Sequence, residues 1–342
     1  MAKIGIGVIG LGRMGQVYAT FSASQLADAK LVAVADMRSD VASQFADRVG
    51  GATIYTDYHD LLADPEVHAV IVTTPTSTHR DVVIAVAEAG KAIFCEKPTA
   101  LTLSATDEMI AAVERAGVMF QVGFMRRFDT GYEAAKRQIE AGVIGDPVTI
   151  RSIGRDPFRT SLEYANPAVS GGLILDMGIH DFDLLRWLMG DEVQRVYTEV
   201  ASLVYPELLD VGDVDNAMIN VRFERGGLGN VEVSRTANYG YDIQCNIIGT
   251  KGALQVGYLQ ETPVLILTPD GARHDVVPHF PQRFGPAYTA QIAHFVDCLK
   301  QDKSPSVTHK DARAALQIGL AATRSQHECR IVYVSEITAD QF

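Results

Sequence analysis

The chain has 342 residues and a formal net charge of −12, with 47% hydrophobic and 21% charged residues. At about 150 residues per domain this length predicts about two domains, and the composition is ordinary for a globular protein. The acidic balance argues against a nucleic-acid partner, because a phosphate backbone favours a basic surface. The four cysteines show no CxxC spacing, which excludes a disulfide framework and a zinc ribbon.

The amino-terminal sequence MAKIGIGVIG lacks the apolar core and cleavage site of a signal peptide. Apolar runs elsewhere stay short of the ~18 residues that a membrane span requires. We therefore expect a cytoplasmic protein that does not engage a membrane.

The first third of the chain alternates short apolar runs with helical patterns. Strands are predicted at residues 3–10, 30–36, 53–58, 69–75, 92–98 and 118–124. Helical spacing of apolar residues predicts helices at residues 13–26, 40–50, 78–90 and 104–117. Near-continuous apolar strands that alternate with helices are typical of a parallel sheet covered on both faces. We therefore expect an α/β domain of Rossmann type over residues 1–124.

A G-x-G-x-x-G spacing at Gly10, Gly12 and Gly15 lies between the first predicted strand and the first predicted helix. In this context Gly10 permits a tight turn, Gly12 lets the backbone approach a pyrophosphate, and Gly15 allows close packing of helix and strand. The helix N-terminus then offers N–H donors to the phosphates. A glycine-rich turn without a ligand is the alternative, and the surrounding strand and helix argue against it.

Asp36 ends the second predicted strand, about 20 residues after the glycines, where a ribose-binding carboxylate is expected. A carboxylate there accepts hydrogen bonds from ribose hydroxyls and repels a 2′-phosphate, so NAD is favoured over NADP. Arg38 complicates this choice, because an arginine two residues further on can reach a 2′-phosphate. We therefore expect NAD as the cofactor and leave dual use of NADP open.

From about residue 125 the regular alternation stops. One helix is predicted at residues 130–145, and strands or hairpins follow at residues 147–156, 193–206, 216–227, 228–240, 241–258, 263–269 and 273–279. Helices are predicted near the end, at residues 287–301 and 308–326. These patterns indicate an α+β domain over residues 125–342 with a large open, mostly antiparallel sheet. We expect the substrate site between the two domains, and a homo-oligomer, by first choice a tetramer, packed through the bare sheet face.

The segment CEKP at residues 95–98, together with the GLGRMG turn, resembles the Gfo/Idh/MocA family of NAD(P)-dependent sugar and polyol dehydrogenases. Residues 170–190, SGGLILDMGIHDFDLLRWLMG, match the segment where that family carries a D-x-x-x-H signature. The segments GFMRRFDTGY, GDVDNA and SRTANYGYD narrow the resemblance toward its inositol branch, and the resemblance covers essentially the whole chain. It implies NAD-dependent oxidation of a secondary hydroxyl of a cyclic polyol, by first choice myo-inositol to its 2-keto derivative.

Three residues are predicted to carry this chemistry. His180 can accept the hydroxyl proton, because histidine titrates near neutrality. Asp176 lies one turn before it, and on a helix the two side chains would share a face, so the carboxylate could orient the imidazole. Lys97, at the carboxyl end of a strand, could bind the reacting oxygen and stabilise alkoxide charge. A metal site formed by Asp176, His180 and Asp183 is the alternative, and we expect none, because no other histidine has a matching spacing.

The remaining predicted contacts complete the site. The predicted cofactor residues are Gly10, Gly12, Arg13, Met14, Gly15, Asp36, Arg38, Thr73, Thr74, Pro75, His79, Glu96 and Lys97. The predicted substrate residues are Lys97, Arg127, Asp156, Asp176, His180 and Tyr239. For Arg127 the alternative is structural, with Arg126 or Arg127 paired to Asp129. The Lys97–Pro98 peptide bond is a candidate cis bond, because the backbone must turn there.

Two other functions remain open from the sequence. One is a dehydrogenase of another polyol or sugar, such as scyllo-inositol, a pyranose or an anhydrosugar. The other is a regulatory protein that binds NAD(H) without turnover, which the joint presence of Lys97 and His180 argues against. The expected partner in every enzymatic reading is a small-molecule polyol or sugar.

Overall fold

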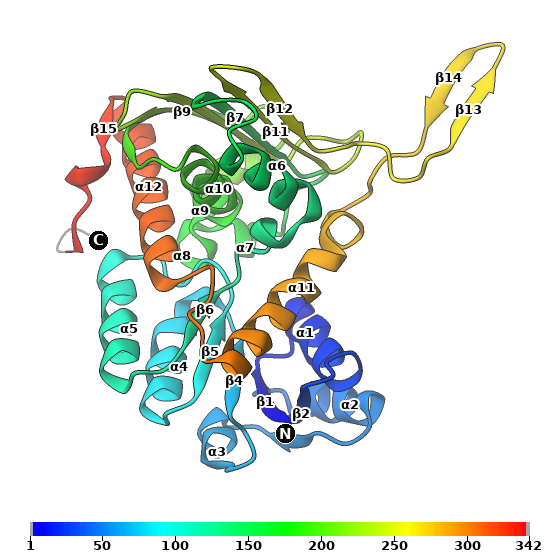
Figure 1. The fold of residues 1–342 in the computed structure, drawn as a ribbon, viewed down its shortest axis with the longest axis vertical. Coiled ribbons are helices and arrows are strands. Elements are labelled where there is room, and N and C mark those ends of the chain that lie inside the picture. Colours follow the sequence, from blue (N-terminus) through cyan, green and yellow to red (C-terminus); the bar gives the residue numbers. More distant parts are fainter. Residues whose placement is uncertain (1–2, 340–342) are drawn as a thin grey trace. The chain divides into compact units, whose positions relative to one another are not determined.

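The computed structural model describes residues 3–339, which form two compact units (Figure 1). The first unit runs to Phe124 and also includes Tyr288–Arg313. The second unit comprises Met125–Ala287 and continues from Ala314 onward. The sequence assigns residues 125–342 to one domain, so the return of Tyr288–Arg313 to the first unit is a difference from that expectation.

The first unit is built on a six-stranded sheet with the order β3-β2-β1-β4-β5-β6, in which every pairing is parallel. Its strands are β1 (Ile4–Ile9), β2 (Ala29–Ala35), β3 (Thr53–Tyr55), β4 (Ala69–Val72), β5 (Ala92–Cys95) and β6 (Phe120–Val122). The connecting helices are α1 (Arg13–Ser24), α2 (Ser39–Val49), α3 (Tyr58–Ala63), α4 (Thr76–Glu88) and α5 (Leu103–Ala116). The strand order is that of a doubly wound dinucleotide fold, which confirms the predicted class.

Helix α11 (Phe280–Gln301) explains why the chain returns to the first unit. Its apolar residues Ile292, Phe295 and Val296 belong to the same buried cluster as the strand residues of the parallel sheet. Polar contacts add to this packing, because Gln291 donates from Nε2 to the Tyr18 hydroxyl on α1 at 2.7 Å. Burial of such apolar side chains contributes about 1.5–3 kcal/mol each, so this half of α11 is bound to the first unit.

The second unit contains a seven-stranded sheet with the order β12-β11-β7-β10-β9-β8-β15. Only β7 (Pro147–Arg155) and β10 (Leu228–Ser234) pair in parallel among the described strands of this sheet, so the prediction of a mostly antiparallel sheet is confirmed. The other strands are β8 (Val193–Ala201), β9 (Asn216–Phe223), β11 (Asp242–Gly249), β12 (Ala253–Val256) and β15 (Val332–Tyr333). Helices of this unit include α6 (Thr130–Glu140), α10 (Ile179–Met189) and most of α12 (His309–Glu328).

Strands β13 (Leu265–Thr268) and β14 (Gly271–His274) pair only with each other. The expectation that residues 263–279 extend the large sheet is therefore wrong: this hairpin projects from the second unit (Figure 1). All eight of its strand residues are exposed, so it lacks the one-sided burial that holds a strand on a sheet. Within residues 3–339, no helix combines the length and the apolar character needed to cross a membrane.

Candidate active site

The glycine turn follows β1 and opens α1, and two of its three glycines are required by close contacts of the backbone. Gly10 has a φ of +91°, and a Cβ added there would lie 2.9 Å from the Thr73 carbonyl group. A Cβ on Gly15 would lie only 1.9 Å from the Gly10 carbonyl oxygen. A Cβ on Gly12 would meet nothing within 4 Å. Gly10 and Gly15 are thus required by the fold itself, whereas Gly12 faces open space that a ligand can approach.

The N-terminus of α1 suits an anionic group. Gly12 is the N-cap residue and places no side-chain hydrogen bond on the helix end, and the first turn contains no acidic residue. The N–H groups of this turn and the helix dipole therefore favour negative charge, as the dinucleotide phosphates require. The exposed Arg13 and half-buried Met14 begin the helix beside this turn.

Asp36 directly follows β2 and is tied to the glycine turn. One carboxylate oxygen accepts from the Leu11 N–H at 2.8 Å, and both oxygens accept from Arg38 at 3.0–3.1 Å. Burial opposes ionisation of Asp36, but the hydrogen bonds from Arg38 and Leu11 outweigh it and hold the pKa of the carboxyl below its usual value. The Arg38 guanidinium is thus paired with Asp36.

His79 connects the loops that follow β4 and β5. It is 1% exposed, with Nε2 placed 2.8 Å from the Thr74 carbonyl oxygen and Nδ1 placed 2.9 Å from that of Pro98. Burial lowers the pKa of His79, although the surrounding backbone hydrogen bonds act in the opposite direction. This predicted cofactor residue is therefore a buried link between Thr74, in the loop that joins β4 to α4, and the Lys97–Pro98 turn. That peptide bond is cis, as the sequence predicts.

Glu96 lies directly after β5 and contacts α1. Its carboxylate accepts from the Tyr18 hydroxyl, and its second oxygen accepts from the Lys97 N–H at 3.1 Å. Burial raises the pKa of Glu96 above its usual value, while Tyr18 and Lys97 act to lower it. Tyr18, which sequence reasoning missed, is fully buried and also accepts from Gln291. The Glu96 carboxylate thus fixes the backbone at Lys97 through this hydrogen bond.

Thr73, directly after β4, lies next to the glycine turn that follows β1. Its hydroxyl donates to the Gly10 carbonyl oxygen at 2.7 Å, and Pro75 is the N-cap residue of α4. Because β1, β4 and β5 are parallel neighbours, the residues that follow them meet at one edge of the sheet. The structure therefore brings the predicted cofactor residues of the first unit together at this edge.

In the second unit, Asp176 and His180 lie on two helices rather than one. Asp176 is the last residue of α9 (Gly172–Asp176), and His180 is the second residue of α10. The chain breaks between them at Gly178, where an added Cβ would lie 2.4 Å from the Ile174 carbonyl oxygen. The expectation that both side chains share one face of a single helix is therefore wrong, although the break keeps both residues in the same short segment.

The Asp176 carboxylate is held by groups far away in the sequence. Its Oδ2 accepts from Arg235 Nη2 at 2.9 Å, and its Oδ1 accepts from the Tyr164 hydroxyl at 3.2 Å. Arg235, which is 1% exposed, also donates to Asp213 at 3.3 Å. Sequence reasoning missed Arg235, Asp213 and Tyr164. Arg235 and Asp213 lie in two segments that resemble the inositol branch of the family. No local pattern in those segments indicates that the two side chains pair with each other or with Asp176.

The arginines of the MRRF segment pair with α10. Arg126 Nη1 lies 2.6 Å from Asp181, and Arg127 binds Asp183 through two hydrogen bonds of 2.8 and 2.5 Å. The alternative pairing of these arginines with Asp129 is wrong, because Asp129 pairs with Arg283 at 2.6 Å. Arg127 is 8% exposed, and its guanidinium is bound to Asp183. A substrate hydroxyl that binds Arg127 would therefore lie next to this ion pair.

Tyr239 and Asp156 lie near the ends of β10, β7 and β11. The Tyr239 hydroxyl donates to Asp242 at 2.8 Å and accepts from Arg155 at 3.0 Å. The half-buried Asp156 is fixed by its backbone, which pairs with Ser234 and Ala237. Tyr239 remains 44% exposed, so its ring is accessible to a ligand.

Both units of the chain are similar to known proteins. Residues 4–124 match the family model of an oxidoreductase family with an NAD-binding Rossmann fold, and residues 132–255 match the GFO/IDH/MocA C-terminal domain. The chain belongs to the GFO/IDH/MocA oxidoreductase family. It is 42% identical to the scyllo-inositol 2-dehydrogenase (NAD(+)) of Bacillus subtilis, over 93% of this chain and 92% of that one. It is 39% identical to the myo-inositol 2-dehydrogenase of Thermotoga maritima, over 97% and 99% of the two chains.

The fold comparison agrees with the sequence comparison. The crystal structure of scyllo-inositol dehydrogenase from Lactobacillus casei, with bound NAD(H) and scyllo-inositol, superposes with a TM-score of 0.93 at 30% identity, over 97% of this chain and 99% of that one. As a GFO/IDH/MocA member, the protein is an NAD-dependent oxidoreductase that acts on a CH–OH group. The steric freedom at Gly12, the bare N-terminus of α1 and the Asp36 carboxylate all fit that cofactor.

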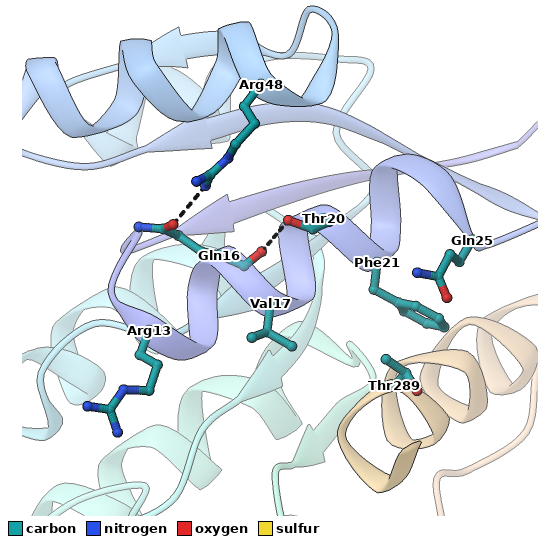
Figure 2. A pocket seen from close by; sticks show the side chains of 8 residues that line it. All are labelled: Arg13, Gln16, Val17, Thr20, Phe21, Gln25, Arg48 and Thr289. Atoms are coloured by element: carbon teal, nitrogen blue, oxygen red, sulfur yellow. Dashed lines mark hydrogen bonds between the residues drawn. The ribbon is translucent and has the colours of Figure 1, made fainter. Parts of the chain in front are cut away.

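A separate open pocket of about 530 Å³ runs along α1 of the first unit (Figure 2). Within it, Arg48 donates to Gln16 at 2.7 Å. Of the predicted site residues, which all lie in the described part of the chain, only Arg13 lines it. Its lining consists of Arg13, Gln16, Val17, Thr20, Phe21, Gln25, Arg48 and Thr289. The pocket therefore belongs to the side of α1 and not to the sheet edge where the predicted cofactor residues meet.

Proposed function

We propose that this GFO/IDH/MocA oxidoreductase oxidises one secondary hydroxyl of an inositol, with myo-inositol converted to its 2-keto derivative. The observation that carries the proposal is the likeness, over more than nine tenths of the chain, to dehydrogenases named for inositols. Scyllo-inositol is the second candidate substrate, because the relative at 42% identity and the Lactobacillus casei structure carry that name.

His180 is proposed as the proton acceptor. His180 is buried in the first turn of α10, and an imidazole is the side chain best suited to remove a proton from a hydroxyl near neutral pH. Asp176 is proposed to orient the substrate and to stabilise the protonated imidazole. Its two oxygens are held by Arg235 and Tyr164, so the carboxylate is fixed in position.

Lys97 is proposed to bind the reacting oxygen. Its backbone is fixed by the Glu96 carboxylate and by the adjacent turn that His79 supports. An ammonium group that approaches the oxygen stabilises the negative charge that develops as the proton leaves. Bound NAD supplies the hydride acceptor, and the glycine turn with Asp36 is proposed to hold it. The other predicted contacts, at Arg127, Asp156 and Tyr239, are proposed to bind the polyol hydroxyls.

The open sheet face of the second unit is proposed as a subunit interface of a cytoplasmic homotetramer. Met218 and Leu228 on neighbouring strands are each 50% exposed, and Ile248 is 55% exposed. Apolar side chains of this kind on a sheet face gain stability when another subunit covers them. Light scattering coupled to size-exclusion chromatography measures the subunit number, and a monodisperse monomer would contradict this part of the proposal.

The catalytic proposal is tested by initial rates of NADH formation with myo-inositol, scyllo-inositol, other inositol isomers, glucose and an anhydrosugar, each with NAD and with NADP. We expect the highest kcat/KM with NAD and an inositol. Lys97→Met and His180→Asn should each lower kcat by at least about 100-fold while NADH still binds. A higher kcat/KM for a hexose than for any inositol would identify the hexose as the substrate. Full turnover in both variants would overturn the mechanism. Tight NADH binding without turnover of any polyol would favour a regulatory role.

A further inference from the structure

We propose that Arg235 is the positioning residue of the active site in the second unit, where it and Asp213 together fix the Asp176 carboxylate in its reactive orientation. The inference rests on the proposed function, because it assumes that Asp176 takes part in the reaction. It adds a residue pair that the predicted site does not contain.

The first observation is the burial of a complete charge cluster. Arg235 is 1% exposed and Asp213 is 4% exposed, while the side chain of Asp176 is 14% exposed. Arg235 donates through Nη2 to Asp176 at 2.9 Å and through Nη1 to Asp213 at 3.3 Å. A buried guanidinium is costly unless it is paired, so this geometry is maintained by the carboxylates on both sides.

The second observation is that the pair fixes both ends of α9. Asp213 Oδ1 accepts from the Leu173 N–H at 2.8 Å in the first turn, and Arg235 binds Asp176, the last residue. Gly172, with a φ of +70°, brings the chain so close that an added Cβ would lie 2.8 Å from Asp213 Oδ1. A helix of five residues is not stable alone, so its position depends on its buried apolar side chains together with these two anchors.

The third observation is the way in which Arg235 itself is held. It directly follows β10, and its backbone N–H donates to the Asp215 carbonyl oxygen at 3.0 Å. Asp213 and Asp215 lie in the segment that leads into β9, the antiparallel neighbour of β10. The large sheet therefore supplies the rigid base from which Arg235 reaches α9, as a precisely oriented functional group requires.

The charge balance of the cluster predicts how the pH profile changes when Arg235 is replaced. Burial raises the pKa of Asp213, the Leu173 N–H and Arg235 lower it, and the Asp176 charge raises it. The charged and titratable groups that face Asp176 are Arg235 after β10, Asp213 before β9 and Tyr164 on α7 (Leu162–Ala165), and His180 follows on the adjoining α10. Loss of the guanidinium would leave two neighbouring carboxylates without their shared cation, so protonation of the pair would begin at higher pH.

The experiment compares Arg235→Met and Arg235→Lys with Asp176→Asn and with a matched control, Arg283→Met. Arg283 is a buried arginine of the same unit, 5% exposed and paired with Asp129, so its loss tests the cost of removing any buried guanidinium. For each full-length variant we measure kcat, KM for the polyol, the pH profile of kcat/KM, the NADH dissociation constant and Tm.

We expect Arg235→Met to lower kcat about 100-fold and to move the acid limb of the pH profile to higher pH, with NADH affinity near wild type. Arg235→Lys should keep the acid limb near its original pH, because the charge remains, and lower kcat about 10-fold, because one ammonium cannot make both contacts. Arg283→Met should lower Tm while the pH profile stays unchanged.

Three results separate the possible failures. An Arg235→Met enzyme with wild-type kcat and an unmoved acid limb would overturn the positioning role. If that variant does not fold, Arg235→Lys decides, and wild-type kcat in it would overturn the role equally. Full turnover in Asp176→Asn would instead overturn the proposed function of Asp176, whatever the Arg235 variants do.

Discussion

The first unit holds its site residues by backbone geometry, hydrogen bonds and one ion pair with an exposed arginine, Asp36 with Arg38, whereas the second unit contains several buried ion pairs. At the sheet edge of the first unit, Gly10 and Gly15 set the turn, and His79 links two loops through carbonyl oxygens. In the second unit, four buried arginines pair with carboxylates: Arg126 with Asp181, Arg127 with Asp183, Arg235 with Asp176 and Asp213, and Arg283 with Asp129.

This difference follows from what each site is proposed to bind. A dinucleotide phosphate is recognised by N–H groups at a helix end, for which a glycine turn suffices. A polyol offers many hydroxyl groups, and side chains with fixed orientation are needed to distinguish them. Buried ion pairs add little stability, but they fix side-chain direction, and breaking one of them is costly.

The largest effect is expected from the turn of the first unit. Gly15→Ala should destabilise the fold by more than about 3 kcal/mol and abolish NADH binding, because the added methyl meets a backbone oxygen that cannot move away. Gly12→Ala is the matched control, since its methyl enters open space: Tm should stay near wild type while NADH affinity falls about 10-fold. Thermal unfolding and NADH fluorescence titration measure both. Normal NADH binding by Gly15→Ala would contradict the steric argument.

The next effect tests the ion pairs of the second unit. Arg126→Met leaves Asp181, which is fully buried, without its cation and should cost about 3–5 kcal/mol in urea unfolding. The double variant with Asp181→Leu removes both charges and should recover much of this loss. Arg159→Met breaks the more exposed pair with Glu207 and should cost far less. Equal losses in Arg126→Met and Arg159→Met would show that burial does not distinguish these pairs.

A smaller effect is expected at the loop link of the first unit. A neutral imidazole has a single N–H, so His79→Leu takes the donor away from one of the two carbonyl oxygens, of Thr74 or of Pro98, and should cost about 1–3 kcal/mol at pH 8. Because the folded-state pKa of His79 is lowered from 6.5, its contribution is fully present above pH 6.5 and is lost as the pH falls below that value. The stability difference between wild type and variant should therefore shrink on acidification. A difference that grows toward pH 5 would contradict a neutral, buried imidazole.

The smallest effect concerns cofactor choice. Asp36→Asn should lower kcat/KM with NAD about 10-fold and raise it with NADP, because the neutral side chain no longer repels a 2′-phosphate and releases Arg38. Asp40→Asn, an exposed acid in the first turn of α2, is the control and should leave the ratio of NAD to NADP unchanged. Initial rates with NAD and with NADP at constant ionic strength measure the ratio of the two kcat/KM values. An unchanged ratio in Asp36→Asn would show that Asp36 does not select the cofactor.

The sequence by itself determined the parts of the protein that depend on neighbouring residues. The alternation of apolar strands and helices predicted the parallel sheet, because each βα unit is local in the chain. The glycine spacing predicted the turn after β1 for the same reason, and the CEKP segment predicted the cis bond at Lys97–Pro98. Each of these features has a signature within a short segment, although the folded sheet and turn also pair with distant residues such as Thr73.

The tertiary structure alone decided which distant residues meet. Asp176 and Arg235 are separated by 59 residues, and Asp129 and Arg283 by 154 residues, so no local pattern couples them. The return of α11 to the first unit depends on burial of Ile292 and Phe295 in a core formed about two hundred residues earlier in the chain. Local backbone preferences are written in the sequence one segment at a time, whereas ion pairing and core packing are settled only when all segments have folded together.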